Sequence, residues 1–398
     1  MSIEVTPLTL DLLQTAITGD GAAFRLRARL QPAGGPGDKV FPPTYSDGQD
    51  GKKQATRYAT ESRVIDGERK PAVLLDSVAA QANRMELALL EARRRRDIRL
   101  PLVSVDFEAE FPDLGRISAL EAPHRVYDAL LRDATLDGTA FRGSEIGRRL
   151  TEASPSDARA MLEYCPTALI FGAWDSTGPL GGSGHKFQRV LVSEVVGIGF
   201  EAGTKVGSRL DPVDIAASVR INIPKEDSDN WSVDEKGKSK GRPSEVNHSN
   251  IAPTRDVEAG GVTFEYALHI AVLSLPALRR VRFGSWDAKT SDAARVLLSA
   301  LGVLAVLLQR REGYDFRSRC SLVPEAPAHL EYMLADGTVR PLSVTVPEAQ
   351  TIYGQALAKA KKAGVTWVED DVVLQPMAKL VQLIRASREA RRAGAAEE

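Results

Sequence analysis

The chain is poor in cysteine. Its 398 residues include two cysteines, Cys165 and Cys320, which stand far apart with no other ligand pattern beside them. A zinc site made of cysteines needs several closely spaced thiolates, so that class of site is excluded. Low cysteine usage is also typical of proteins from reducing compartments. These features predict a cytoplasmic protein without a metal site, and no pattern indicates another cofactor.

Long apolar runs are missing as well. The longest, residues 296–308, is shorter than the roughly 20 residues needed to cross a bilayer. The first residues lack the basic segment followed by an apolar stretch that a secretory signal requires. Hydrophobic residues nevertheless make up 43% of the chain, enough for a substantial core. We therefore expect a soluble, folded protein that does not use a membrane as a partner.

The chain has almost no excess of charge of either sign, since its formal net charge is −1. A protein that binds nucleic acid over its whole surface is usually basic. Any nucleic-acid contact must therefore come from local basic patches. Balanced charge also suits a subunit that packs against copies of itself, because both signs are then needed across a repeated contact.

Acidic residues are absent between Asp175 and Glu194. This stretch contains the loop GPLGGSGHKFQR, residues 178–189, which combines four glycines with three basic side chains: His185, Lys186 and Arg189. Glycine lets a backbone approach a ligand closely and present bare N–H groups, and the cations attract phosphates. The loop therefore predicts a phosphate-binding site. An ordinary glycine-rich hairpin loop with solvated basic residues is the alternative.

The glycine-rich loop is not a nucleotide-binding P-loop. That motif needs Gly-Lys-Ser/Thr at the start of a helix, whereas Lys186 is followed by Phe187. The flanking segments, residues 166–174 and 190–200, are apolar and β-prone, and they predict a strand on each side of the loop. A phosphate polymer is therefore a better candidate ligand than a nucleotide.

The stretch from Asp76 to Arg96 predicts a helix, with Asp76 or Ser77 as its N-cap. Its apolar residues follow the spacing of a buried face: Val78, Ala82, Met85 and Leu89. A polar stripe has the same spacing, turned by about one residue around the axis: Ser77, Gln81 and Arg84. The arginines at 93–96 close the helix, where cations suit the macrodipole, so they need no ligand.

The remaining pattern predicts a mixed α+β protein. Residues 24–30 alternate strictly between apolar residues and arginines, and we expect at least one of these arginines to pair with an acid on a neighbouring strand. Further strands are expected at 100–107 and 263–273, and helices at 155–164, 292–309 and 347–392. Two segments are rich in polar residues and lack a period, which predicts irregular insertions: residues 31–70 and a projecting segment at 223–259. The order suits a single composite α+β domain with a ferredoxin-like core.

Four long and unusual strings carry a resemblance to a known family: LLDSVAAQANRMELALL (74–90), SALEAPHR (118–125), CPTALIFGAWDSTGPLGGSGHKFQRVLVSEVVG (165–197) and VGSRLDP (206–212). With them, most of the chain resembles the backbone subunit of type I-G (formerly I-U) CRISPR effector complexes. This subunit is a member of the repeat-associated RNA-binding (RAMP) superfamily.

The resemblance implies an RRM-like palm with finger and thumb insertions. It further implies that copies of the chain assemble in a helical filament along the guide RNA (crRNA), where a thumb displaces a base at regular intervals. The remaining bases would pair with an invading DNA strand in antiviral defence. The implied partners are the guide RNA, the target DNA strand, copies of the chain, other Cascade subunits and a separate helicase-nuclease.

A guide of variable sequence must be bound without reading its bases, so phosphate contacts are expected. In the resembled superfamily, a Ser-Gln-basic stripe on the first palm helix lies against guide phosphates. The candidate RNA-binding residues come from the predicted helix, the glycine-rich loop, the string VGSRLDP and the insertion at 223–259: Ser77, Gln81, Asn83, Arg84, Gly182, Ser183, Gly184, His185, Lys186, Arg189, Arg209, Lys238 and Lys240.

Two other functions are alternatives to guide binding. Relatives in the superfamily cut RNA, and of the five histidines only His185 and His248 stand in settings suited to RNA, while His269 within a strand is expected to be structural. Acid–base cleavage needs a positioned pair of groups, and no such pair stands out, so we expect no enzyme activity. The other alternative is a scaffold that oligomerises without nucleic acid; co-purification of short RNA would separate it from the RNA-binding function.

Overall fold

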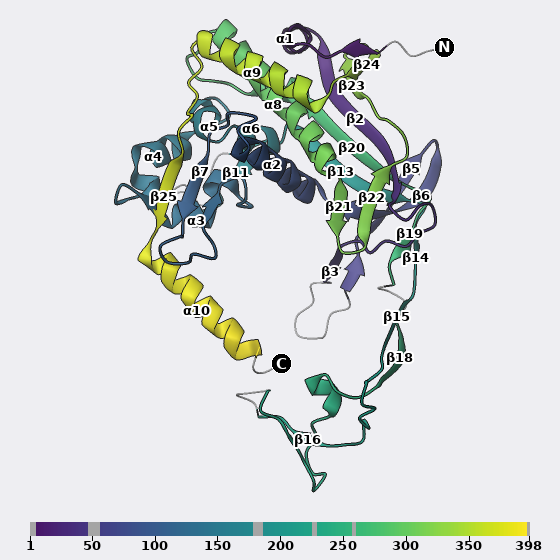
Figure 1. Cartoon of the computed structure of the whole chain (residues 1–398). Helices are drawn as coiled ribbons and strands as arrows, with labels where there is room; N and C mark the ends of the chain where they lie inside the picture. Colours follow the sequence, from purple (N-terminus) through teal and green to yellow (C-terminus); the bar gives the residue numbers. More distant parts are fainter. Residues whose placement is uncertain (1–4, 47–55, 178–185, 225–228, 257–259, 396–398) are drawn as a thin grey trace.

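The computed structural model describes residues 5–46, 56–177, 186–224, 229–256 and 260–395, and within them a ten-stranded sheet is the largest element (Figure 1). Its strands are Thr6–Pro7 (β1), Gly21–Pro32 (β2), Thr60–Ile65 (β5), Glu68–Asp76 (β6), Leu191–Ile198 (β13), Tyr266–Ser274 (β20), Tyr314–Arg317 (β21), Cys320–Pro324 (β22), Leu330–Leu334 (β23) and Val339–Ser343 (β24). Their order is β1-β24-β23-β2-β20-β13-β6-β5, and the β21–β22 hairpin joins the end of β2.

Four central strands define the topology of this sheet. β23, β2, β20 and β13 are neighbours and all pair antiparallel. The helix α2 (Val78–Arg94) precedes β13, and α8 (Ala288–Glu312) lies between β20 and β23. Numbered along the chain, the four strands have the order 4-1-3-2, and two helices make the crossovers. This arrangement is the ferredoxin-like, RRM-like palm that the sequence predicted, with the β5–β6 hairpin added at its edge.

The alternating pattern of β2 produces a strand with two different faces. Its apolar side chains are buried, as predicted. On the other face Arg25 forms an ion pair of 2.6 Å with Glu331 of β23, and Arg29 lies 3.7 Å from the ring centroid of Tyr266. The expectation that at least one arginine pairs with an acid on a neighbouring strand is therefore confirmed.

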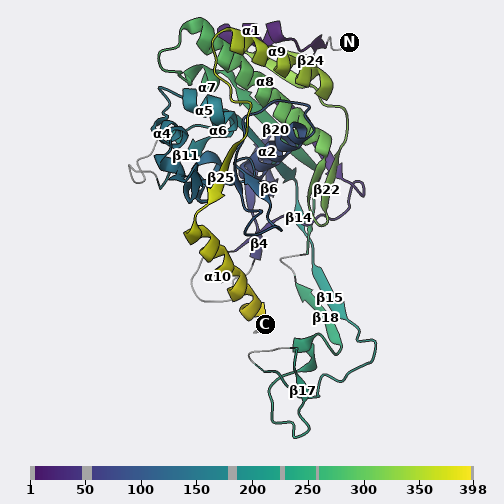
Figure 2. The same ribbon diagram turned by 60° about the vertical axis from the view of Figure 1, so that its left-hand side comes forward.

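Helices cover the apolar face of the sheet (Figures 1 and 2). They are α2 and α8 with α1 (Leu10–Thr18), α7 (Leu275–Arg280) and α9 (Val346–Lys362). The helix expected at 292–309 lies within α8, which is a buried core helix. Among the described residues it is also the one helix long and apolar enough to span a membrane, but 83% of its most apolar window is buried inside the protein. Its apolarity is therefore explained by the core that it fills.

A second, smaller sheet lies beside the palm. Its strands are Val103–Asp106 (β7), Arg116–Ser118 (β8), Ala134–Leu136 (β9), Thr139–Ala140 (β10) and Val372–Pro376 (β25). Short helices surround it: Ala129–Arg132 (α3), Glu145–Glu152 (α4), Arg159–Tyr164 (α5) and Pro166–Phe171 (α6), with 3-10 turns at Arg125–Tyr127 and Phe141–Gly143. The long helix α10 (Ala378–Ala395) extends from it (Figure 2). Because β25 pairs parallel to β7, the C-terminal segment completes a unit begun near residue 100.

A narrow ribbon projects from the edge of the palm (Figure 1). It consists of short two-stranded antiparallel sheets that pair Glu201–Ala202 (β14) with Val262–Thr263 (β19), Lys205–Arg209 (β15) with Ile251–Asp256 (β18), and Ile221–Asn222 (β16) with Ser232–Val233 (β17). A 3-10 turn at Pro243–Val246 lies near the tip. The projection expected at 223–259 thus exists, but it begins earlier, because β14 and β15 form the outgoing side of the ribbon.

Some predicted elements were wrong. Residues 166–171 form a helix, α6, and not a strand; only Ala173–Trp174 (β11) is extended. Pro166 stands at the first helical position, which suits its missing N–H, and every residue of α6 is buried. A short apolar run of this kind fits a buried helix as well as a buried strand, so periodicity could not distinguish them.

Other differences concern boundaries. The segment expected to be irregular at 31–70 contains β5, the start of β6, and a hairpin of Thr44–Ser46 (β3) with Thr56–Tyr58 (β4). The helix expected from 155 begins at Arg159, because residues 154–157 form a turn. The helical segment expected at 347–392 is interrupted by β25. Of these segments, β25 is specified by a strand remote in the sequence, β7, whereas β3–β4 and β5–β6 are local hairpins.

Candidate nucleic-acid interface

A cavity of about 650 Å³ opens between α2 and the hairpin that flanks the glycine-rich loop. This hairpin pairs β11 with Lys186–Phe187 (β12). The exposed polar and aromatic side chains that line the cavity are Asn83, His124, Trp174, Lys186, Gln188 and Arg189. Three predicted RNA-binding residues, Asn83, Lys186 and Arg189, are therefore brought together. Four others, Gly182, Ser183, Gly184 and His185, lie outside the described residues.

An exposed aromatic ring and a cation form one wall of the cavity. Trp174 and Lys186 are paired across the two strands, and the Lys186 Nζ lies 4.4 Å from the Trp174 ring centroid. Trp174 is 45% exposed, although burying a large aromatic ring would stabilise the protein. A ring beside an ammonium group can stack a nucleobase and hold the adjacent phosphate. Sequence reasoning missed Trp174, whose only signal is an aromatic residue at the edge of a basic loop.

A backbone carbonyl orients the Arg189 side chain. Its Nε donates a hydrogen bond of 3.1 Å to the Phe171 carbonyl at the end of α6, while the side chain remains exposed. Asn83 lies on the exposed side of α2 at the same cavity. The cavity thus presents three polar groups: the Arg189 guanidinium, held by a backbone carbonyl; the Lys186 ammonium, beside the Trp174 ring; and the Asn83 amide.

A buried ion pair supports this wall. Arg125 donates from Nε and Nη2 to the two carboxylate oxygens of Glu86 on α2, at 2.7 and 2.8 Å, and from Nη1 to the Gly172 carbonyl at 2.9 Å. Both side chains are almost completely buried. Burial raises the pKa of Glu86, and Arg125 opposes that rise. The pair ties α2 to the start of the β11–β12 hairpin. Arg125 was not singled out from the sequence, since its partner is remote in the chain.

The polar stripe of α2 (Ser77, Gln81 and Arg84) forms hydrogen bonds with other groups of the protein. Ser77 is the N-cap, and its Oγ accepts a hydrogen bond of 3.1 Å from the Ala80 N–H. Gln81 has no exposed surface, and its Nε2 donates to Asp76 at 2.7 Å. The prediction that Gln81 contacts phosphates is therefore wrong for this conformation. The stripe faces the palm because Asp76, Ser193 and their neighbours supply polar partners there.

Arg84 also has internal partners. Its guanidinium donates to Asp76 at 3.0 Å and to the Phe316 carbonyl at 2.8 Å, and its side chain is 31% exposed. Burial raises the pKa of Asp76, opposed by hydrogen bonds from Gln81 and Arg84. Arg84 therefore neutralises a buried carboxylate, and only part of the guanidinium is accessible to another ligand.

A chain of hydrogen bonds continues from Gln81 across the sheet. Ser193 Oγ lies 2.9 Å from Gln81 Oε1 and 2.9 Å from His269 Nε2, and His269 Nδ1 lies 3.0 Å from the Tyr314 hydroxyl. Because the carboxylate of Asp76 accepts from the Gln81 amide, Gln81 Oε1 must accept from Ser193. His269 Nε2 therefore donates to Ser193. Burial lowers the pKa of His269, so the imidazole is neutral and Nδ1 accepts from Tyr314. These buried contacts support the structural role expected for His269.

The neutral state of His269 predicts a pH dependence of stability. Burial lowers the pKa of His269 to about 3, with a smaller contribution from Arg310. At pH values below the ordinary histidine pKa of about 6.5, the unfolded chain binds a proton that the folded chain does not. The free energy of unfolding therefore decreases as the pH is lowered through this window. Between pH 7 and pH 5 this group alone should remove about 2 kcal/mol.

Urea unfolding of the wild type and of His269→Gln at both pH values checks this effect, because the variant lacks the titrating group. The loss between pH 7 and pH 5 should be smaller in the variant. Equal losses would show that His269 does not carry it. Independently, the imidazole ¹⁵N signals of the wild type should report the Nε2–H tautomer throughout this range.

The remaining predicted residues lie on the projection. Arg209 donates from Nε to the Ser249 carbonyl at 3.1 Å and from Nη2 to the His248 carbonyl at 2.5 Å, so it braces the ribbon. Lys238 and Lys240 are exposed, and no ion pair of theirs is found among the described residues. The rings of Trp231 and His248 lie edge to face, with centroids 5.6 Å apart, and form an aromatic pair on the same projection.

Within the described ranges, no group of three or more His, Cys, Asp or Glu side chains is placed to hold a metal ion. Both cysteines are buried, and burial raises the pKa of Cys165 and brings that of Cys320 to about 12. These two thiols are therefore protonated at neutral pH and are poor nucleophiles.

A model of a known protein family matches part of the chain. Residues 24–202 match the model of a family described as CRISPR-associated protein GSU0053, which spans a little under half of the chain. The matched segment runs from β2 through α2 and four of the five strands of the small sheet to β13, so it includes the residues that line the cavity. No curated protein is significantly similar to the chain. The match indicates a CRISPR-associated protein family and supports a role in CRISPR defence.

Proposed function

We propose that this chain, which is similar to a CRISPR-associated family, is the multi-copy backbone subunit of a type I effector complex. In this role it binds the guide RNA through its phosphates and presents the bases for pairing with invading DNA. Its partners are then copies of itself, the other subunits of the complex and a separate helicase-nuclease.

The observation that carries this proposal is the cavity beside α2. It joins the exposed Trp174 ring to Lys186 and Arg189 at the foot of a glycine-rich loop, on an RRM-like palm. Stacking on an aromatic ring tolerates every base, since each base has a π-face. Cations that bind phosphates add affinity without adding sequence information. The combination suits a guide RNA whose sequence varies.

Binding should therefore depend strongly on salt and weakly on sequence. Single-stranded RNAs of unrelated sequence are expected to bind with similar affinity, with a slope of log K against log salt of about −0.7 for each phosphate neutralised. Fluorescence anisotropy at several salt concentrations measures both quantities. Affinities that differ between spacers by the large factors typical of specific sites would contradict the proposal.

Two substitutions distinguish base stacking from phosphate binding in the cavity. Trp174→Ala should weaken RNA binding by about 1–3 kcal/mol with an unchanged salt slope, because it removes stacking. Lys186→Ala should make the slope shallower by about 0.7, because it removes one phosphate contact. Arg69→Ala, an exposed arginine on the edge hairpin, is the matched control and should change neither. An unchanged affinity in both cavity variants would locate the interface elsewhere.

We also propose that the chain holds RNA without cutting it. Cleavage needs a positioned acid and base, and the proposal gives the cavity residues only binding roles. Labelled guide and complementary RNA should stay intact on the purified protein with and without magnesium. Cuts at regular intervals that disappear in His185→Ala would favour the endoribonuclease alternative instead.

A further inference from the structure

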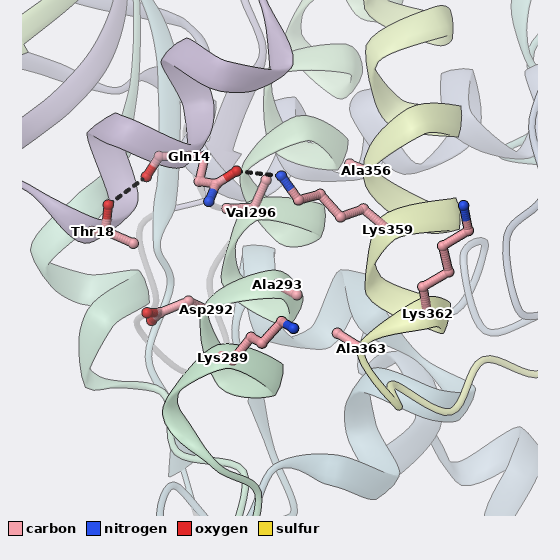
Figure 3. A pocket seen from close by; sticks show the side chains of 10 residues that line it. All are labelled: Gln14, Thr18, Lys289, Asp292, Ala293, Val296, Ala356, Lys359, Lys362 and Ala363. Carbon is pink, nitrogen blue, oxygen red and sulfur yellow. Dashed lines mark hydrogen bonds between the residues drawn. The ribbon is translucent and has the colours of Figure 1, made fainter.

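A second cavity, of about 450 Å³, lies between α1, α8 and α9 (Figure 3). Small apolar side chains form its floor: Ala293 and Val296 from α8, Ala356 from α9, and Ala363 directly after the end of α9. Its rim is polar and is made of Gln14, Thr18, Lys289, Asp292, Lys359 and Lys362. None of these residues belongs to the cavity beside α2.

The rim carries more positive than negative charge, with three lysines and one aspartate. In Figure 3 Lys289 extends from α8 toward α9, and Lys359 reaches from α9 to Gln14, whose neutral amide oxygen accepts its hydrogen bond. Asp292, the acid of the rim, points away from α9 and forms an ion pair of 2.7 Å with Arg295. Among the described residues, neither Lys289 nor Lys362 has an ion-pair partner.

Helix stability explains only part of this charge. Lys359 and Lys362 lie in the last turn of α9, where a cation is favoured by the helix macrodipole. Lys289 lies in the first turn of α8, where the macrodipole disfavours a cation by about 0.3–1 kcal/mol. Lys289 also adds like charge to a rim that already carries two lysines. Its attraction to the N-cap carboxylate of Asp287 offsets part of this cost, but Asp287 does not line the cavity.

We propose that this cavity is a docking site for an acidic peptide segment of a partner protein. An aliphatic side chain of the segment fills the floor, and flanking carboxylates bind the three lysines. The shape and charge favour a peptide over nucleic acid. The described lining has neither an arginine nor an aromatic ring for a base, and phosphates alone would leave the apolar floor unused.

The test uses the fluorescein-labelled peptide Glu-Glu-Leu-Leu-Glu-Glu, with blocked ends, and the full chain. Fluorescence anisotropy should give a dissociation constant of about 10–100 μM, because the cavity holds few residues and exposed charge pairs are weak. The double variant Lys289→Glu/Lys362→Glu should bind about tenfold more weakly or not at all. The matched control Arg69→Glu/Arg340→Glu makes the same change in net charge at exposed sites outside the cavity and should bind normally.

The floor is tested separately from the charge. Ala293→Met partly fills the cavity and should also weaken binding of the peptide, while replacing both leucines of the peptide by serine should abolish binding to the wild type. Equal binding of the serine peptide, or unchanged affinity of the lysine variant at an unchanged melting temperature, would overturn the proposal. So would loss of RNA affinity in the lysine variant with no peptide binding by the wild type, which would identify a nucleic-acid groove.

Discussion

Arg125→Met should lower the free energy of unfolding by about 3–5 kcal/mol, although it removes a single charge. Arg125 donates two hydrogen bonds to the Glu86 carboxylate and a third to the Gly172 carbonyl. Without it Glu86, which is 1% exposed, keeps a hydrogen bond with Thr167 but loses its counter-charge. Urea unfolding at pH 7 measures the loss.

The double variant Glu86→Leu/Arg125→Met is the control for lost packing. It removes both charges, so most of the stability should return, because apolar side chains replace a buried pair at little cost. In Arg125→Met alone, the pKa of Glu86 rises further, so the folded state binds a proton more readily than the unfolded chain. The deficit should then shrink as the pH falls from 7 to 5. A loss below about 1 kcal/mol at pH 7 would contradict the role given to this pair.

Gly172→Ala should disrupt the cavity beside α2 and cost several kcal/mol of stability. Gly172 has φ +83° and ψ 156°, a combination almost restricted to glycine, and forcing another residue into it costs about 1–3 kcal/mol. An added Cβ would also lie 2.9 Å from the Phe187 carbonyl oxygen and 2.9 Å from Arg189 Cγ. The β11–β12 hairpin must move to relieve these contacts, so RNA affinity should fall with the melting temperature.

Gly313→Ala is the matched comparison for this substitution. Gly313 ends α8 with φ +92° and ψ −168°, close to the conformation of Gly172, but nothing lies within 4 Å of an added Cβ. It should therefore show the backbone cost alone and leave RNA affinity unchanged. Equal effects of the two substitutions on stability and binding would refute the steric explanation for Gly172.

Elements with a long, regular pattern were predictable from the sequence. β2 alternates over its length, α2 has an apolar stripe and an N-cap, and α8 is apolar over several turns. Each pattern reports burial against the core, which is what stabilises the element. α6 was not predictable in this way, because a buried run of six residues has the same composition in a helix and in a strand.

The candidate site was predictable only where it is local in the sequence. Lys186 and Arg189 follow from the composition of the glycine-rich loop. Trp174 and Arg125 gain their roles from contacts with distant segments, which a single sequence does not reveal. Gln81 is the reverse case: its position in the sequence predicted an RNA contact, but its side chain is buried. It lies at the boundary of the buried face of α2, and its burial depends on Ser193 and His269, which come from two other strands.

The projecting ribbon has a consequence for how the chain unfolds. Its side chains are largely exposed, for example Val206 at 70% and Leu210 at 86%, so little apolar burial holds it together. A two-stranded hairpin of this kind is marginally stable by itself, and it should open and exchange its amide protons long before the palm does. Trp231 is on this ribbon, whereas the other three tryptophans belong to the body. Denaturation followed at Trp231 should therefore be a separate, earlier transition, and the protein should behave as two cooperative units.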